Sequence, residues 1–243
     1  MEDKIVGIMG GMGPEATVDL MLRVIKATPV KDDADHIRMI VDNNPKVPSR
    51  IRALLEGIGE SPGPYLANMA RRLESWGADF LAIPCNTAHY YYEDVRSAVR
   101  IPVLNMIELT ASRVVGDNPG IQRVGVLAAT AVLKTGLYSK SIGRHGVTVA
   151  YPSVDLQDRL MGIIHTIKTG RYGQKETDAL DAAAKYLVAE KAQALVIACT
   201  ELSLIGNTVD SGIRLYDASQ VLAETIVRKA KNMETHSSSS GSQ

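Results

Sequence analysis

Short apolar stretches alternate with longer amphipathic stretches along most of the chain. The short stretches are rich in β-branched residues, as buried strands are, and cover residues 4–9, 37–41, 80–84, 103–106, 123–128, 147–151, 194–198 and 213–216. The longer stretches have helical spacing and cover residues 16–28, 64–76, 91–99, 155–169, 177–191 and 219–232. Strands that alternate with helices form mainly parallel sheets with helices on both faces. The pattern therefore predicts an α/β fold.

The second half of the chain repeats landmarks of the first half in the same order. IVGIM at residues 5–9 resembles RVGVL at residues 123–127, and FLAIPCNT at residues 80–87 resembles ALVIACTE at residues 194–201. Because the two pairs have nearly the same offset, we expect two pseudo-symmetric lobes that face each other across one cleft. Open α/β sheets bind ligands at the carboxyl ends of their strands. Each cysteine follows a strand, so the two thiols are expected to meet across the cleft.

The expected division places residues 1–113 and 215–236 in an N-terminal lobe and residues 114–214 in a C-terminal lobe. Residues 114–122 are rich in glycine, proline and asparagine and are predicted to be a turn-rich crossover between the lobes. The serine-rich residues 237–243 are expected to form a mobile tail without a functional role.

Composition excludes several classes of partner. The chain has 243 residues, of which 45% are hydrophobic and 22% are charged, as is typical of a globular protein. Lys plus Arg equals Asp plus Glu at 27 each, so no net charge draws the chain to nucleic acid or to an anionic membrane. The N-terminus does not have the pattern of a secretory leader, and no apolar run approaches the ~20 residues that span a bilayer. We therefore expect a cytoplasmic protein.

The two cysteines, Cys85 and Cys199, are expected to be free thiols, because a single disulfide is uncommon in a cytosolic chain. An arbitrary pair of cysteines would be two small buried side chains. Two thiols at duplicated positions instead suit racemisation, in which one group removes the α-proton and a second group delivers a proton to the opposite face. A free thiol has a pKa of ~8.5, close enough to neutrality for both protonation states to be used. Cys85 and Cys199 are therefore the candidate catalytic residues.

Small polar residues follow each cysteine where a helix is expected to begin. They are Asn86 and Thr87 in the first half, and Thr200 and Glu201 in the second. Such positions offer hydroxyl, amide and backbone N–H groups to an anion, and an α-carboxylate would fit there. They could also be ordinary helix caps, although two matching sites favour substrate binding.

A glycine-rich segment, GGMGPEAT at residues 10–17, leads from the first strand into a helix. Its glycines match part of a dinucleotide-binding loop, but Pro14 and Glu15 lie where the backbone would have to approach a pyrophosphate. The equivalent segment of the second half, residues 128–131, is poor in glycine, which favours a site the size of a carboxylate over a cofactor site. Met12, Gly13 and Thr130 are therefore candidate substrate-binding residues.

Three segments resemble the signature segments of the aspartate/glutamate racemase superfamily, in particular its aspartate racemase branch. They are GGMGPEAT at residues 10–17, PCNTAH at residues 84–89 and ACTEL at residues 198–202, and the likeness spans nearly the whole chain. The resemblance implies two pseudo-symmetric α/β domains and a two-thiol enzyme that needs neither pyridoxal phosphate, nor any other cofactor, nor a metal. It further implies a small amino-acid substrate and a homodimer; the balanced charge already argues against a nucleic-acid or membrane partner.

The resemblance also implies binding residues for the distal carboxylate of the substrate. In that branch, a basic residue after an Asn-Pro segment and a lysine in the second lobe bind this group. Arg50 and Lys168 stand at the matching positions, and Asn43, which begins the Asn-Pro segment, is a further candidate binding residue; the two cations could also be ordinary solvated side chains. Ser49 and His165 stand where this branch usually carries acidic residues, which leaves the substrate range open. By the same analogy, Cys85 would serve the D-enantiomer and Cys199 the L-enantiomer.

Three alternatives remain at this point. A broad-specificity racemase or a maleate isomerase-like enzyme would keep the fold and change the reaction or the substrate. Hydantoin racemases and arylmalonate decarboxylases have similar loops, but Arg50 and Lys168 favour a dicarboxylic substrate and the second cysteine disfavours a one-thiol decarboxylase. A regulator that binds a nucleotide or another small ligand, with structural cysteines, is the alternative from another class.

His89 and His165 are either auxiliary polar groups of the site or structural histidines.

Overall fold

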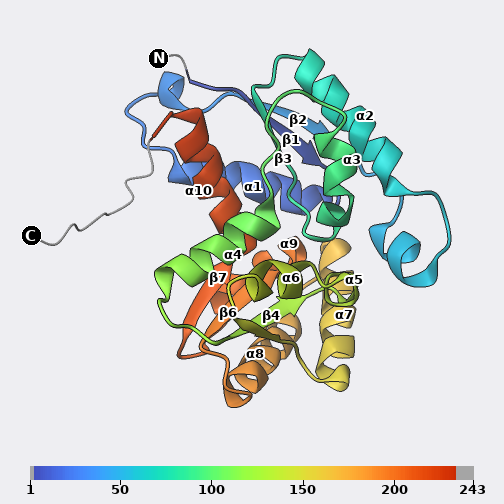
Figure 1. Cartoon of the computed structure of the whole chain (residues 1–243), viewed down its shortest axis with the longest axis vertical. Helices are drawn as coiled ribbons and strands as arrows, with labels where there is room; N and C mark the ends of the chain where they lie inside the picture. Colours follow the sequence, from blue (N-terminus) through green and yellow to red (C-terminus); the bar gives the residue numbers. More distant parts are fainter. Residues whose placement is uncertain (1–2, 234–243) are drawn as a thin grey trace, which may run out of the picture.

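The computed structural model describes residues 3–233 and contains two parallel sheets (Figure 1). The first sheet has the order β2-β1-β3 and comprises β1 (Val6–Gly10), β2 (Met39–Asn43) and β3 (Phe80–Ala82). The second sheet has the order β5-β4-β6-β7 and comprises β4 (Arg123–Ala128), β5 (Thr148–Ala150), β6 (Ala194–Ala198) and β7 (Arg214–Asp217). These sheets confirm the α/β fold.

Helices cover both faces of the first sheet. On one face, α2 (Pro62–Ser75) packs Leu66, Met69 and Leu73 against β1 and β3, and α3 (Tyr92–Arg96) adds Val95 to the same cluster. On the other face, α1 (Pro14–Ala27) and α10 (Ala218–Ala230) pack against the opposite side chains of the same strands. The apolar residues of this sheet are thus buried on both sides, which is why its strands read as continuous apolar runs.

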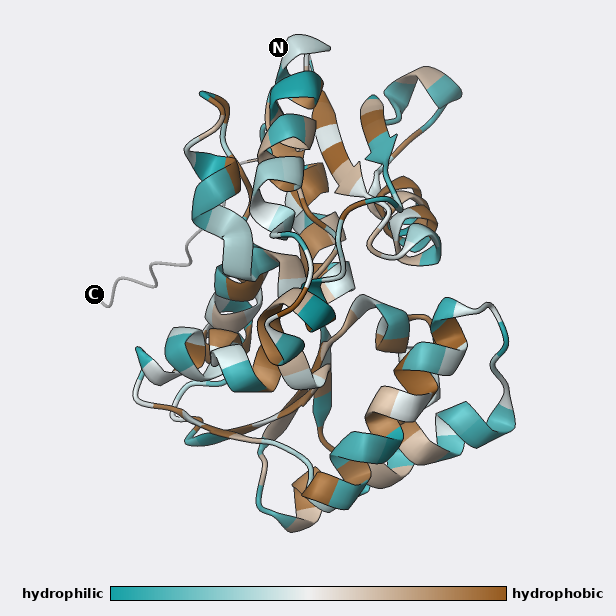
Figure 2. Cartoon of the chain, turned by 90° about the vertical axis from the view of Figure 1, so that its right-hand side faces the viewer, coloured by the Kyte–Doolittle hydropathy of each residue, from teal (hydrophilic) through white to brown (hydrophobic). Residues whose placement is uncertain are grey.

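The second sheet has the same layered arrangement. One face is covered by α7 (Val154–Lys168) and α8 (Gln174–Ala189), and the other by α4 (Met106–Asp117) and α6 (Leu137–Gly143). Figure 2 shows brown and teal positions mixed along the helices, as expected where one side faces a sheet and the other faces solvent. Short helical segments complete the chain: η1 (Asp33–Asp35), the π-helical turn η2 (Arg52–Glu56), η3 (Thr87–Tyr91), α5 (Thr130–Thr135), α9 (Thr200–Ser203) and η4 (Gly206–Thr208).

The crossover between the sheets differs from the prediction. Residues 103–106 form only an isolated bridge between Leu81 and Val103, and α4 extends through Asp117 into the segment predicted to be a turn. The Asn105 side chain accepts hydrogen bonds from the N–H groups of residues 107 and 108, at 3.1 and 3.2 Å, so a helix begins where a strand was expected. The buried residues Ile107, Ala111 and Val114 of α4 have helical spacing that the strand assignment overlooked.

The return of the chain to the first sheet also lies later than expected. Strand β7 pairs with β6, including Leu215 opposite Leu195, so residues 215–217 belong to the second sheet and not to the N-terminal lobe. The return occurs where the Asp217 carboxylate accepts a hydrogen bond from the Ser219 N–H at 2.8 Å and caps α10. The predicted tail, residues 237–243, lies outside the described residues.

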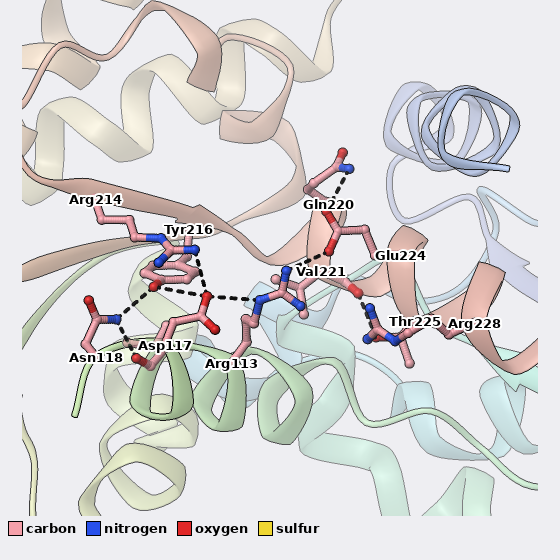
Figure 3. A network of polar contacts seen from close by, with 11 residues as sticks. Arg113, Asp117, Asn118, Arg214, Tyr216, Gln220, Val221, Glu224, Thr225 and Arg228 are labelled. Carbon is pink, nitrogen blue, oxygen red and sulfur yellow. Dashed lines mark hydrogen bonds and ion pairs between the residues drawn. The ribbon is translucent and has the colours of Figure 1, made fainter. Parts of the chain in front are cut away.

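A network of ion pairs connects helix α4 to helix α10 and strand β7 (Figure 3). Arg113 of α4 contacts Asp117 and Glu224, each at 3.1 Å, and Arg214 of β7 contacts Asp117 at 2.8 Å. Because Glu224 lies on α10, the network spans the two points where the chain crosses between the sheets. Within residues 3–233, no helix combines the length and the apolar character needed to cross a lipid bilayer.

Candidate active site

The two cysteines lie at corresponding places in the two sheets. Cys85 follows β3 and Cys199 follows β6, and these strands pair with β1 and β4, the first strands of their respective sheets. Both are free thiols, buried to 6% and 5% exposure, and both line one cavity of about 40 Å³. The fold therefore brings two thiols from equivalent strand ends to a single cavity.

Most of the predicted binding residues share this cavity with the thiols. Its lining includes Met12, Arg50, Asn86, Thr87, Lys168, Thr200 and Glu201. Gly13 lines an adjoining chamber of about 400 Å³, which has Met12, Ser49, Arg50, Lys168 and Glu201 in common with the cavity. The sequence thus identified most of the polar lining of the site, and the chamber shares five lining residues with the cavity.

Two predicted residues do not line the cavity or the chamber. Asn43 is exposed at the end of β2, and the Thr130 hydroxyl accepts a hydrogen bond from the Gln157 amide at 3.2 Å. Ala129 lines the cavity in place of Thr130. The sequence also missed the lining residues Ile51, Ile164 and Ala198. Ile164 lies one helical turn before Lys168, a spacing that could have identified it.

Close packing explains two glycines of the 10–13 segment. Gly11 has a φ of +90°, and a Cβ there would lie 2.3 Å from the backbone carbonyl carbon of Asn44. The Gly11 N–H donates to the Thr17 hydroxyl at 2.9 Å, which fixes the turn on α1. A Cβ on Gly13 would lie 3.6 Å from Glu201 Oε1, so this segment borders the Cys199 side of the cavity.

The Glu201 carboxylate lies between the Cys199 thiol and the Lys168 ammonium group. The thiol donates a hydrogen bond to Glu201 Oε2 at 3.2 Å, and Lys168 Nζ lies 3.7 Å from Glu201 Oε1. Burial raises the pKa of the Cys199 thiol well above its usual value, the Glu201 carboxylate raises it further, and Lys168 opposes these effects. Cys199 is therefore protonated in the ligand-free protein at neutral pH.

The backbone around Cys85 is held by a buried histidine. His89 Nδ1 lies 2.9 Å from the Cys85 carbonyl oxygen, and the Met106 N–H donates to His89 Nε2 at 3.0 Å. Burial lowers the pKa of His89 to about 4, so the ring is neutral, with its proton on Nδ1. His89 is thus a structural group that supports the Cys85 loop. His165 is exposed on α7 and does not line the cavity.

The Arg50 guanidinium is anchored on one side and available on the other. It donates hydrogen bonds to the carbonyl oxygens of Val47, Pro48 and Met12, at 3.3, 3.1 and 3.2 Å. A guanidinium carries five N–H donors, so two remain for a ligand once the contacts within residues 3–233 are counted. Arg50 therefore keeps N–H donors beyond its backbone contacts, and it lines the cavity that contains both thiols.

The segments that follow the cysteines are shorter than expected. They are the 3₁₀ turn η3 and the four-residue helix α9, so neither has the macrodipole of a full helix. The Asn86 side chain makes no capping hydrogen bond with its own turn. Its Oδ1 atom instead accepts a hydrogen bond from the Tyr138 hydroxyl at 2.7 Å. An anion bound beside Asn86 would therefore contact side-chain groups rather than the N-terminus of a full helix. The interpretation of Asn86 as a helix cap is wrong.

Comparisons with known proteins agree with this arrangement. The family model for Asp/Glu/hydantoin racemase matches residues 9–226. The chain is 28% identical over 227 residues to the broad specificity amino-acid racemase RacX of Bacillus subtilis, covering 92% of this chain and 96% of that protein. It superposes on an aspartate racemase from Picrophilus torridus with a TM-score of 0.80 at 31% identity, covering 94% of each chain.

A more distant neighbour supports the fold alone. An aspartate racemase homologue from Pyrococcus horikoshii superposes with a TM-score of 0.74 at 21% identity, and the match covers 94% of this chain and 99% of that one. The family match extends over both sheets and includes both cysteine-bearing loops. The chain therefore belongs to the Asp/Glu/hydantoin racemase family and is an amino-acid racemase.

Proposed function

We propose that the protein interconverts the enantiomers of a small acidic amino acid, aspartate first and glutamate second, by proton transfer between Cys85 and Cys199. The observation that carries the proposal is the shared cavity: two thiols from equivalent strands line it together with Arg50 and Lys168. Two acid/base groups of the same kind suit a reaction that must run in both directions.

In the proposed step, one proton leaves one face of the α-carbon and another proton is added to the opposite face. The Cys85 thiolate takes the α-proton and becomes a thiol, while the Cys199 thiol gives its proton to the opposite face and becomes a thiolate. The protonated resting state of Cys199, with its raised pKa, supports its role as the acid in this direction. The two roles exchange in the reverse reaction. In keeping with the resemblance, we assign D-enantiomer deprotonation to Cys85 and L-enantiomer deprotonation to Cys199.

The polar lining supplies partners for both carboxylates of the substrate. We assign the α-carboxylate to Asn86, Thr87 and Thr200, which lie beside the thiols in the sequence and line the same cavity. Hydrogen-bond donors there would stabilise the negative charge that develops when the α-proton leaves. We assign the distal carboxylate to Arg50 and Lys168, of which Arg50 offers the bidentate geometry.

The direct test is isotope exchange by the purified protein without added cofactor. We expect L-aspartate in deuterated water to lose its α-proton NMR signal while D-aspartate accumulates. A panel of other L-amino acids under the same conditions defines the substrate range. Absence of exchange with every amino acid, together with a thermal shift on addition of a nucleotide, would favour the ligand-binding regulator.

A broader substrate range is the second candidate. The chamber of about 400 Å³ beside the cavity is lined in part by Pro14, Val47 and Leu204, which could accommodate side chains larger than that of aspartate. Ser49, which lines both spaces, replaces the acidic residue usual in the aspartate racemase branch. Exchange with neutral amino acids at rates close to that of aspartate would favour this candidate. A homodimeric assembly and a cytoplasmic location stay predictions.

A further inference from the structure

Tyr138 places one hydroxyl group inside an apolar cluster. It lies on α6, is fully buried, and packs among the side chains between α4, α6 and the second sheet. Its hydroxyl donates to Asn86 Oδ1 at 2.7 Å, and Asn86 follows the loop of the first sheet that carries Cys85. Burying a hydroxyl without a partner costs free energy, and Asn86 Oδ1 supplies an acceptor for this donor. It connects the second sheet to the site residue next to Cys85.

The amide oxygen of Asn86 is hydrogen-bonded, whereas its nitrogen has no partner among the described residues. The side chain is 2% exposed and lines the cavity that contains both thiols. Its Oδ1 accepts from Tyr138, whereas its Nδ2 has no hydrogen-bond partner within residues 3–233. An unpaired buried amide N–H₂ group is costly, and such groups in functional sites commonly meet a ligand. The group offers two N–H donors to an anion in the cavity.

The Tyr138 hydroxyl is a dependable donor. Burial raises the pKa of the Tyr138 phenol, so the group keeps its proton at neutral pH. In the observed contact the hydroxyl donates to the amide oxygen, so the oxygen of Asn86 faces the tyrosine and the nitrogen faces away. The opposite orientation would present the amide oxygen to a carboxylate and repel it.

We infer that Tyr138 is a positioning residue that acts through Asn86: its hydroxyl holds the amide oxygen so that the N–H₂ group faces the substrate carboxylate. The inference rests on the proposed function, because it takes the cavity to be the site that binds the amino acid. It adds a residue that touches no substrate and that the sequence did not single out.

The first test is the variant Tyr138→Phe, which removes only the hydroxyl. We expect kcat/KM for aspartate to fall roughly tenfold to 100-fold, as when a buried hydrogen-bond partner is lost. The Kd of succinate, a dicarboxylate without an α-amino group, should rise by a similar factor. The matched control is Tyr151→Phe, which removes a hydroxyl that pairs with Ser139 at 2.9 Å away from the cavity lining, and which should leave both values unchanged.

A double-mutant cycle separates positioning from a general structural role. In an Asn86→Ala background, Tyr138→Phe should change kcat/KM and the succinate Kd by less than about twofold, because no amide remains to be oriented. Equal losses in both backgrounds would overturn the inference, as would wild-type kinetics and binding in Tyr138→Phe. Succinate binding by calorimetry needs no turnover, so the cycle can be completed even if Asn86→Ala is inactive.

A variant at Asn86 covers the case in which Tyr138→Phe does not fold. Asn86→Asp keeps an acceptor for the tyrosine and removes the N–H donors, so succinate binding should weaken by at least the same factor, and binding at the wild-type level would overturn the inference.

If the wild-type protein exchanges the α-proton of no amino acid, the proposed function fails. If the wild type exchanges and Tyr138→Phe is unaffected, only the inference about Tyr138 fails.

Discussion

Replacement of Arg50 by alanine tests the assignment of the distal carboxylate. Three guanidinium N–H groups bind the carbonyl oxygens of Val47, Pro48 and Met12, which leaves two for the substrate among the described contacts. Two hydrogen bonds between charged groups at about 1.5 kcal/mol each amount to about 3 kcal/mol. A loss of this size corresponds to a fall of roughly 100-fold in kcat/KM.

The assay compares aspartate with asparagine, which replaces the distal carboxylate by an amide of similar shape. Arg50→Ala should lower kcat/KM for aspartate by roughly 100-fold and affect asparagine much less. Arg50→Lys should give an intermediate loss, because lysine keeps the charge but not the planar fork. Arg52→Ala is the matched control: Arg52 is exposed at 62%, pairs with Glu56, and lies outside the cavity lining.

Two results would refute this reasoning. A loss that is the same for aspartate and asparagine would mean that Arg50 only holds the loop at residues 47–48 against Met12. Retention of aspartate turnover within about threefold would mean that the two free N–H groups do not meet the substrate. In either case the distal carboxylate would have to be assigned elsewhere, with Lys168 as the next residue to test.

Three further predictions follow from the site and its supports. Glu201→Gln removes the carboxylate that raises the pKa of Cys199, so the ascending limb of the pH–rate profile should move to lower pH; an unchanged profile would contradict the coupling. Because the unfolded state protonates His89 below pH ~6.5 and the folded state only near 4, stability should fall by up to about 3 kcal/mol as pH drops through this window. Denaturant unfolding should show a smaller fall in His89→Gln than in the wild type or in the exposed-site control His145→Gln, and equal falls would contradict the assignment. Gly11→Ala combines a φ of +90° with a Cβ 2.3 Å from the Asn44 backbone, so it should destabilise the fold by about 2–4 kcal/mol, and an unchanged Tm would contradict the packing argument.

The sequence predicted the sheets better than the elements between them. Buried strands such as β4 and β6 are apolar at nearly every position, so their composition alone identifies them. The crossover helix α4 was missed because its first residues, Met106 and Ile107, continue an apolar run that resembles a strand; the Asn105 cap and the helical spacing of Ile107, Ala111 and Val114 mark the change. The sheet membership of β7 depends on its long-range pairing with β6, which local patterns do not encode.

The residues of the candidate site could also be predicted in part, whereas contacts between distant segments could not. The two thiols and their polar neighbours could be found because the repeat places them at equivalent strand ends. The contact between Tyr138 and Asn86 joins helix α6 to the loop after β3, and the pairing of Lys168 with Glu201 joins two different helices, so neither could be derived from spacing along the chain. Thr130 was chosen by analogy with the first half, but its hydroxyl is bound by Gln157.

The central claim is that two thiols act on one carbon, and it is tested most directly by measuring racemisation of aspartate in single-cysteine variants. Cys85→Ala and Cys199→Ala should each lower the rate by at least about 1000-fold, because each removes one of the two groups that must transfer a proton. The double variant should be hardly slower than either single variant, since the thiols act as a unit. Activity within about tenfold of the wild type in either single variant would contradict the account.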